Sequence, residues 1–89
     1  FGVDIQQIVA MEELGELIQA ISKIARWEYS QSEDLETLSE YIDNLAEEIA
    51  DVEIMLEQLK QCYGCHIQVN DHKRKKLDKL KSMVEGVRV

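Results

Sequence analysis

Residues 8–25, IVAMEELGELIQAISKIA, form the stretch that decides the fold. Its apolar residues recur at spacings of three and four positions, which places them along one face of an α-helix. We predict that this helix runs from about Val3 to Glu28. The apolar residues that define it are Ile8, Met11, Leu14, Leu17, Ile18, Ile21, Ile24 and Ala25.

The same periodicity returns after a polar break at residues 30–32. Ser32 is the expected N-cap, because a serine oxygen can accept a hydrogen bond from a first-turn amide. We predict a second helix from about Glu33 to Gln61, with Gly64 as the residue that stops it. Its apolar residues are Leu35, Leu38, Ile42, Leu45, Ile49, Val52, Met55, Leu56 and Leu59.

A third helix is predicted from Val69 or Asn70 to about Glu85, with Leu77, Leu80 and Val84 on its inner face. Asn70 or Asp71 would cap it. The short stretch His66–Val69 gives the one strand-like signal. The chain contains no proline and only four glycines, which favours long helices. The fold class is therefore all-α, with residues 1–89 forming a single domain of three long helices.

A chain of 89 residues is near the size at which one hydrophobic core is marginal. The two long helices should also leave apolar stripes uncovered. We expect a homodimer that assembles a four-helix-bundle core, with a tetramer as the alternative.

The charge is unevenly placed along the chain. Residues 1–57 hold fifteen acidic side chains against only Lys23 and Arg26, whereas residues 73–88 hold seven of the ten basic ones. The acidic part argues against nucleic-acid binding. No signal-peptide pattern and no apolar run of membrane-spanning length occur, so we expect a cytoplasmic protein without a membrane partner.

Two short acidic motifs carry the chemistry. Glu12-Glu13-Leu-Gly-Glu16 pairs Glu13 with Glu16, and Glu47-Glu48-Ile-Ala-Asp51 pairs Glu48 with Asp51. Residues three apart are neighbours on one helix face, and both pairs lie among apolar residues. Carboxylates in such surroundings need a partner. We predict that the two helices pack together and that these four carboxylates converge on divalent metal.

The ligand type favours a particular class of metal. All-oxygen ligands suit Mg²⁺, Mn²⁺ or Ca²⁺. Di-iron bundles use Glu-x-x-His, and neither motif has a histidine three residues on. Magnesium ions shared with substrate phosphates can activate water for phosphoryl chemistry.

The two motifs, within EELGELIQAISK and EEIADVEIMLEQLK, resemble those of the MazG-type all-α nucleoside triphosphate pyrophosphohydrolases. The resemblance extends from about Val9 to Leu80. It implies hydrolysis of a nucleoside triphosphate to the monophosphate and pyrophosphate, with Mg²⁺, or alternatively Mn²⁺, on Glu13, Glu16, Glu48 and Asp51. It further implies that Glu12 supports a metal-bound water or orients the attacking one.

The resemblance also points to residues that would bind the substrate. Lys73 matches the phosphate-facing lysine of the family best, with Arg74 and Lys76 as further candidates, although Leu77 stands where relatives often have a polar residue. From the residues alone, Trp27 could stack on a nucleobase or pack in a core. Lys23 could reach a phosphate or form a surface ion pair.

Two alternative functions follow from the same residues. A non-catalytic acidic helical module for interaction or regulation predicts carboxylates that face solvent and no metal-dependent stability. Phosphoribosyl-ATP pyrophosphatase uses similar acidic helices, but a histidine-containing segment typically follows its second motif. Here Val52-Glu53-Ile54-Met55 follows Asp51, which disfavours that substrate.

A second motif, Cys62-Tyr63-Gly64-Cys65-His66, has the spacing of a c-type haem attachment site and could also begin a zinc site with His72. The predicted helix end at Gly64 offers a simpler interpretation, in which two reduced cysteines flank a turn. We favour this interpretation, with haem attachment and a zinc site as the alternatives.

Overall fold

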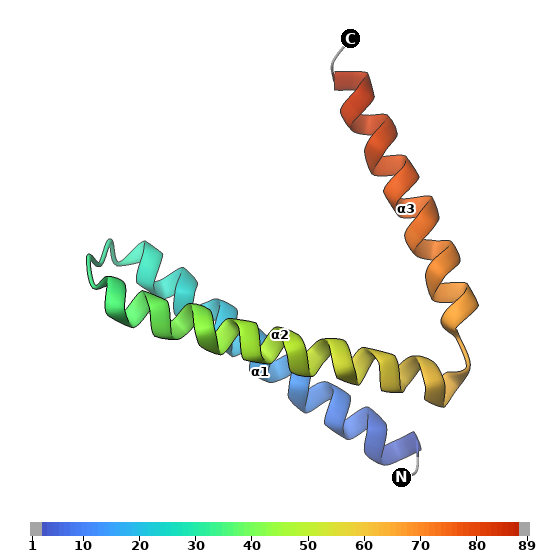
Figure 1. Cartoon of the computed structure of the whole chain (residues 1–89), viewed down its shortest axis with the longest axis horizontal. Helices are drawn as coiled ribbons and strands as arrows, with labels where there is room; N and C mark the ends of the chain where they lie inside the picture. The colour runs from blue at the N-terminus through green and yellow to red at the C-terminus, as the bar shows by residue number, and fades with distance from the viewer. Residues whose placement is uncertain (1–2, 88–89) are drawn as a thin grey trace.

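The computed structural model describes residues 3–87, which form three helices joined by two short turns. Helix α1 spans Val3–Tyr29, α2 spans Leu35–Tyr63 and α3 spans His66–Val87. Helices α1 and α2 form a long antiparallel hairpin, and α3 leaves the end of α2 at a steep angle, so that the molecule has the outline of a V (Figure 1). The predicted all-α class and the three helices are confirmed.

The turn between α1 and α2 is held by local hydrogen bonds. Asp34, not the predicted Ser32, is the N-cap of α2, because its carboxylate accepts from the backbone N–H of Thr37 at 3.1 Å and from the Thr37 hydroxyl. Ser32 supports the cap by accepting from the backbone N–H of Asp34 at 3.2 Å. Gln31 adopts a left-handed backbone conformation with φ of 56°.

Gly64 ends α2, as the sequence predicts. Its φ of 59° and ψ of 38° place it in the left-handed region, which a side chain disfavours, and its N–H donates to the carbonyl of Lys60. The N–H of Cys65 donates to the same carbonyl at 3.1 Å. Helix α3 begins directly afterwards at His66, and the N–H of Val69 donates to the carbonyl of Cys65. The strand-like signal at residues 66–69 and the later helix start are therefore wrong.

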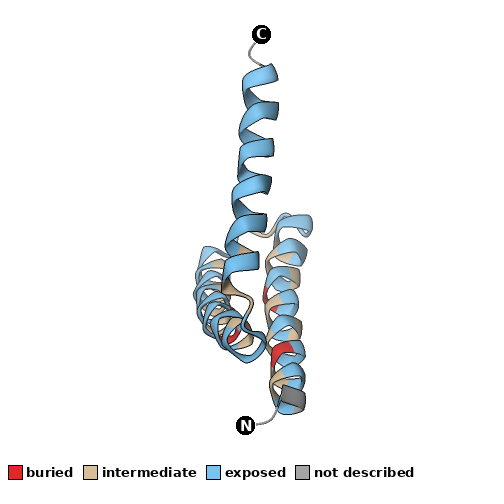
Figure 2. Cartoon of the chain, turned by 90° about the vertical axis from the view of Figure 1, so that its right-hand side faces the viewer, coloured by how far each residue is buried: buried red, intermediate tan, exposed pale blue. Residues whose placement is uncertain are grey.

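The core is thin and lies between α1 and α2. Its buried members are Ala10 and Ala20 of α1 and Val52 and Met55 of α2, and Leu17 and Leu59 pack against part of it. Met55 is 2% exposed and packs in one cluster with Ala10 and Val52, where the small side chain of Ala10 leaves room for it. Buried positions occur only on the hairpin among the described residues, and α3 is exposed along nearly its whole length (Figure 2).

Within one chain, α3 lacks the inner face that its periodicity predicts. Leu77, Leu80 and Val84 are 64%, 57% and 55% exposed, respectively. In the described part of the chain, the one helix pair that packs along its length is α1 with α2. The sequence of α3 is amphipathic, but no other helix of residues 3–87 covers Leu77, Leu80 and Val84.

Candidate metal centre

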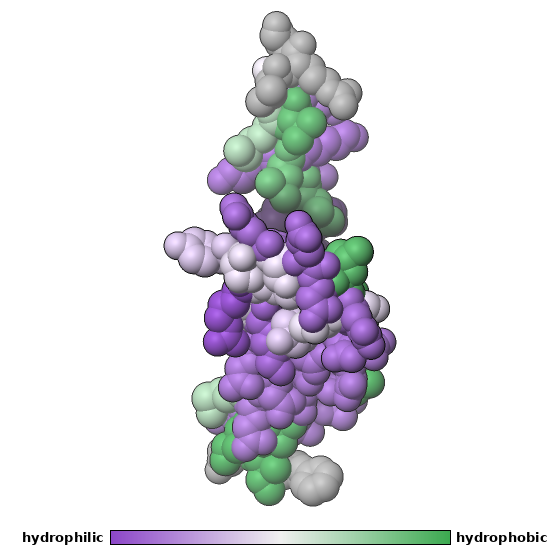
Figure 3. Space-filling view, turned by 90° about the vertical axis from the view of Figure 1, so that its left-hand side faces the viewer, coloured by the Kyte–Doolittle hydropathy of each residue, from purple (hydrophilic) through white to green (hydrophobic). Residues whose placement is uncertain are grey.

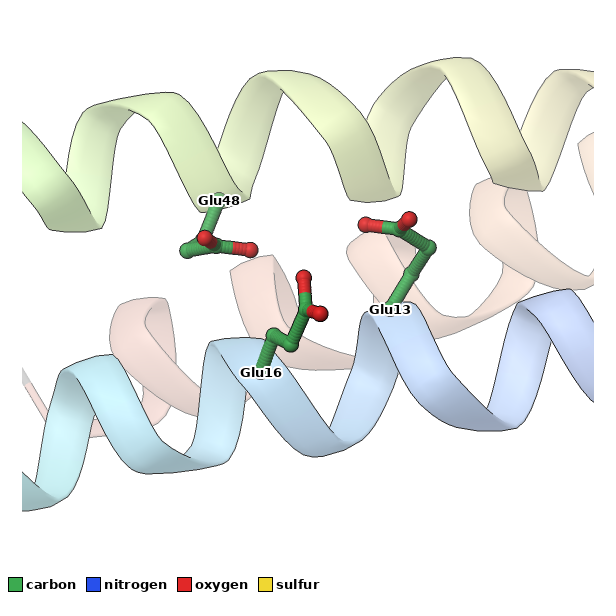
Figure 4. Close-up of side chains that lie close together, drawn as sticks. All are labelled: Glu13, Glu16 and Glu48. Atoms are coloured by element: carbon green, nitrogen blue, oxygen red, sulfur yellow. The ribbon is translucent and has the colours of Figure 1, made fainter.

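Three carboxylates meet in the middle of the hairpin. Glu13 and Glu16 project from neighbouring turns of α1, and Glu48 projects from α2 opposite them (Figure 4). One carboxylate oxygen from each lies within 4.8 Å of the others. The antiparallel packing of α1 on α2 brings the two acidic motifs to the same level, so the predicted convergence holds for these three residues.

Two of these carboxylates have an oxygen that is cut off from water. The Oε2 atoms of Glu13 and Glu48 are buried and have no hydrogen-bond partner. A carboxylate oxygen in that position is destabilising unless a proton or a cation satisfies it. The exposed Glu16 and the half-buried Glu13 and Glu48 form the one group of three or more potential metal-ligating side chains found in residues 3–87.

The electrostatics of the cluster agree with its geometry. Burial, followed by repulsion from Glu16 and Asp51, raises the pKa of Glu13 above its ordinary value of 4.5. Burial, again followed by Glu16 and Asp51, raises the pKa of Glu48. Each negative charge therefore makes its neighbours harder to ionise, and a divalent cation would reverse that effect.

Asp51 and Glu12 border the cluster without joining its three converging oxygens. Asp51 is half-buried on α2 and is near enough to raise the pKa of Glu13 and Glu48. Glu12 is exposed and makes a smaller contribution of the same kind to Glu13. The structure thus brings together three of the four predicted ligands and places the fourth beside them.

A shallow cavity of about 180 Å³ opens next to the carboxylates. Glu13 and Asp51 line it together with Val9, Ile54, Met55 and Gln58. Sequence reasoning missed Gln58, although its position seven residues after Asp51 places it two turns further along the same side of α2. The donor set is all oxygen, and two of its oxygens are buried without partners, which fits Mg²⁺ or Mn²⁺.

Trp27 and Lys23 lie toward the turn of the hairpin. They line a cavity of about 280 Å³ with Arg26, Ser30, Ser32 and Tyr41. The indole Nε1 of Trp27 donates to the carbonyl of Asp34 at 3.1 Å, so the ring helps to fix the α1–α2 turn. Helical periodicity places Lys23 on the same side of α1 as Glu16, about 10 Å further along the axis.

The basic residues of α3 lie away from the carboxylates of their own chain. Lys73 lines a cavity of about 580 Å³ between α2 and α3, which we call the notch. Arg74 pairs with Asp71 at 3.3 Å, and Lys76 is exposed. In the view of the three carboxylates, α3 passes behind the hairpin (Figure 4).

The Cys62–His66 motif forms the junction between α2 and α3. Both thiols are free, Cys62 exposed and Cys65 half-buried. The Nε2 of His66 lies 2.9 Å from Oε1 of Glu57. This contact is the largest cause of the lowered pKa of Glu57, ahead of the contact with Lys60. Within residues 3–87, Cys62, Cys65, His66 and His72 do not form a group of three or more potential metal-ligating atoms. The predicted helix end at Gly64 is confirmed.

Comparison of the chain with known protein families, with curated proteins and with solved structures finds no match. Among the described residues, none of the helices combines the length and the apolar character that a membrane crossing needs.

Proposed function

We propose that the chain is a Mg²⁺-dependent nucleoside triphosphate pyrophosphohydrolase, with Mn²⁺ as an alternative ion. The observation that carries the proposal is the pair of buried, unpartnered oxygens on Glu13 and Glu48 beside Glu16. Three carboxylates from two helices do not gather at a helix interface for packing energy, because their mutual repulsion opposes the fold. The resemblance of the two acidic motifs to those of the MazG-type enzymes supplies the reaction class.

Glu13, Glu16 and Glu48 would hold the ion, and Asp51 would complete the set after a small rearrangement of its side chain. When bound, Mg²⁺ supplies charge neutralisation at the phosphates and lowers the pKa of a water. Glu12, exposed at the edge of the cluster, would orient that water and accept its proton. Attack at the α-phosphorus forms one P–O bond and breaks the bond to the bridging oxygen, so that pyrophosphate leaves and the monophosphate remains.

The substrate would lie along the side of the hairpin that bears Glu16, Lys23 and Trp27. Lys23 would meet phosphate oxygens, and Trp27 would meet the base. Lys73, Arg74 and Lys76 would bind phosphates from a second copy of the chain. We further propose that the protein is a homodimer with a four-helix core, or a tetramer built from such dimers. The many exposed leucine and isoleucine side chains on α1 and α2 support this assembly.

Pyrophosphate release from a panel of nucleoside triphosphates with Mg²⁺ tests the activity. Glu16→Ala should lower kcat/KM by about three orders of magnitude, because losing a ligand removes water activation and charge neutralisation together. Glu47→Ala removes an equally charged, exposed side chain outside the cluster and should leave the rate within about twofold. Primary release of inorganic phosphate, or full activity of Glu16→Ala, would refute the proposal.

A matched pair of α3 variants tests phosphate binding. Lys73→Ala should raise KM about ten- to hundredfold with a smaller change in kcat, as expected for one contact in a partly solvated site. Lys75 lies on the opposite side of α3, and Lys75→Ala should leave KM unchanged. Equal effects of the two substitutions would show that α3 acts only through its overall charge.

A non-catalytic interaction module is the second candidate, and the largely exposed α3 favours it. It predicts no pyrophosphate release with any nucleotide and no effect of metal on stability. The same nucleotide panel and a melting curve with Mg²⁺ therefore separate the two functions.

A further inference from the structure

A groove of amide and apolar side chains leads away from the carboxylates along the hairpin. It is a cavity of about 200 Å³ lined by Ile5, Gln6, Val9 and Gln58, and we call it the amide groove. Val9 and Gln58 also line the cavity of about 180 Å³ that opens next to the carboxylates. The two cavities therefore adjoin, and the amide groove extends the candidate site toward the start of α1.

The amide of Gln6 has unused hydrogen-bonding capacity. Its Oε1 atom is buried and has no hydrogen-bond partner, which is destabilising because that oxygen has given up its bonds to water. Rotation about the terminal torsion of the side chain, which is broad for an amide, can turn the oxygen toward the groove. Gln58 is exposed on α2 and lines the same groove. A ligand with an N–H donor would satisfy an oxygen that the fold leaves without a partner.

The lining of the amide groove indicates which part of a ligand it fits. The described residues that line it are two apolar and two amide side chains without a charge. Seen from the left-hand side of Figure 1, apolar side chains gather at the lower end of the hairpin, toward the start of α1 (Figure 3). An amide presents a donor beside an acceptor, and this pair matches the N6 and N7 edge of adenine. With apolar contacts for the faces of a planar ring, the groove suits an uncharged heterocyclic base.

The amide groove and Trp27 lie at opposite ends of the carboxylate cluster. Gln6 precedes Glu13 by seven residues, or about 10 Å along α1, whereas Trp27 follows Glu16 by eleven residues, or about 16 Å. Both spacings return to nearly the same side of a helix. A nucleoside triphosphate with its base at Trp27 and its phosphates at the carboxylates leaves the amide groove unfilled. A ligand that fills both ends carries a base at each end of a polyphosphate.

We propose that the substrates of this site are dinucleoside polyphosphates, with one base at Trp27 and the second base in the amide groove. Gln6 and Gln58 are then specificity-determining residues that bind the edge of the second base. The inference rests on the proposed function, because it uses the same metal ion, the same water and the same point of attack. It adds a second base-binding site and a substrate class to that function.

The reaction begins with attack at the α-phosphorus of the nucleotide whose base lies at Trp27. The oxygen of water forms a bond to that phosphorus, and the bond from the phosphorus to the bridging oxygen breaks. The bridging oxygen keeps the electron pair and leaves with the second nucleoside and the remaining phosphates, while a proton of the water passes through Glu12 to solvent. Diadenosine tetraphosphate is thus hydrolysed to AMP and ATP.

Initial rates with diadenosine tetraphosphate and with ATP, each with Mg²⁺, test the inference once the nucleotide products are separated by anion-exchange chromatography. The wild type should cleave the dinucleotide with a kcat/KM at least about tenfold above that for ATP, because the second base adds contacts. Gln6→Leu should raise KM for the dinucleotide about ten- to hundredfold and leave the rate with ATP within about twofold. Gln58→Leu, at an exposed position outside the core, should act in the same direction.

Gln7→Leu is the matched control, because Gln7 is exposed beside Gln6 and its amide donates to the Tyr63 hydroxyl. It should leave both rates within about twofold. In every variant, the rate with ATP reports whether the metal site is intact. Three results would overturn the amide groove while the proposed activity stands: a dinucleotide cleaved no faster than ATP, equal losses on both substrates in Gln6→Leu, or release of two ADP molecules. If neither substrate is cleaved, the proposed function fails and this inference fails with it.

Discussion

Replacing Glu48 by Gln tests the two roles proposed for that carboxylate, a source of repulsion without metal and a ligand with it. In metal-free buffer the variant should melt higher than the wild type, because it removes a charge whose pKa is raised by burial and by its acidic neighbours. With Mg²⁺ the order should reverse. An ion at a hundred times its Kd stabilises a folded protein by about 2.7 kcal/mol, which raises Tm by roughly 10–20 °C for a chain of this size.

The loss expected in the variant follows from the ligand count. Glu48 is one of three side chains whose oxygens converge, and losing it should weaken the metal about a hundredfold or more. The same Mg²⁺ concentration would then equal the variant's Kd, and Tm should rise by only about 2–3 °C. Differential scanning calorimetry with and without EDTA measures both effects.

Glu47→Gln is the matched control. Glu47 is adjacent, carries the same charge and is exposed outside the cluster, so its substitution should preserve the metal response. A wild type whose Tm does not move at millimolar Mg²⁺ or Mn²⁺ would refute the metal centre. A Glu48→Gln variant that melts lower than the wild type without metal would refute the account of repulsion.

Three further predictions concern the fold and its pH dependence. Since the folded pKa values of Glu13 and Glu48 lie above 4.5, the metal-free folded state holds protons more tightly than the unfolded state, so stability should increase as pH falls from neutral toward 4.5; urea titrations that show the opposite slope would contradict this. Met55→Ala should lower the free energy of unfolding by about 2–5 kcal/mol, because Met55 is 2% exposed and its loss leaves a cavity. A decrease below about 1 kcal/mol in denaturant melts would show that the core packs less tightly than the burial of Met55 indicates. Replacing both Cys62 and Cys65 by Ser should leave pyrophosphate release and the oligomeric state unchanged. Loss of bound zinc or of a haem absorbance band in the variant would overturn that expectation.

Local sequence patterns are sufficient to predict the helices. Periods of three and four define α1 and α2, and Gly64 marks a helix end because few other residues tolerate its φ of 59°. The errors fall where two local signals compete. Ser32 and Asp34 can both cap a helix, and the carboxylate of Asp34 prevails through its two bonds to Thr37. Residues 66–69 contain β-branched side chains, but an α-helix restarts directly after the left-handed glycine.

The cluster of Glu13, Glu16 and Glu48 was predictable only in part, for a physical reason. Spacing within each motif identifies which carboxylates share a helix face, and the apolar neighbours indicate that this face is packed. The register between α1 and α2 depends on tertiary packing, and it decides that Glu48 meets Glu13 and Glu16 while Asp51 lies beside them. The position of α3 could not be read from its amphipathic pattern, because that pattern specifies an apolar side without specifying which chain covers it.

The short junction at Gly64 sets the direction of the whole of α3. Helix α3 is about 33 Å long and is joined to α2 by two residues, Gly64 and Cys65. A change of about 10° in the direction of α3 therefore moves its far end by about 6 Å. Within residues 3–87, α3 lies against the hairpin only near its start, where Val69 and Lys73 line the notch. The backbone torsions of Gly64 and Cys65 therefore set the angle between α2 and α3. Substitutions at Gly64 can adjust the spacing of two surfaces on different helices without altering either surface.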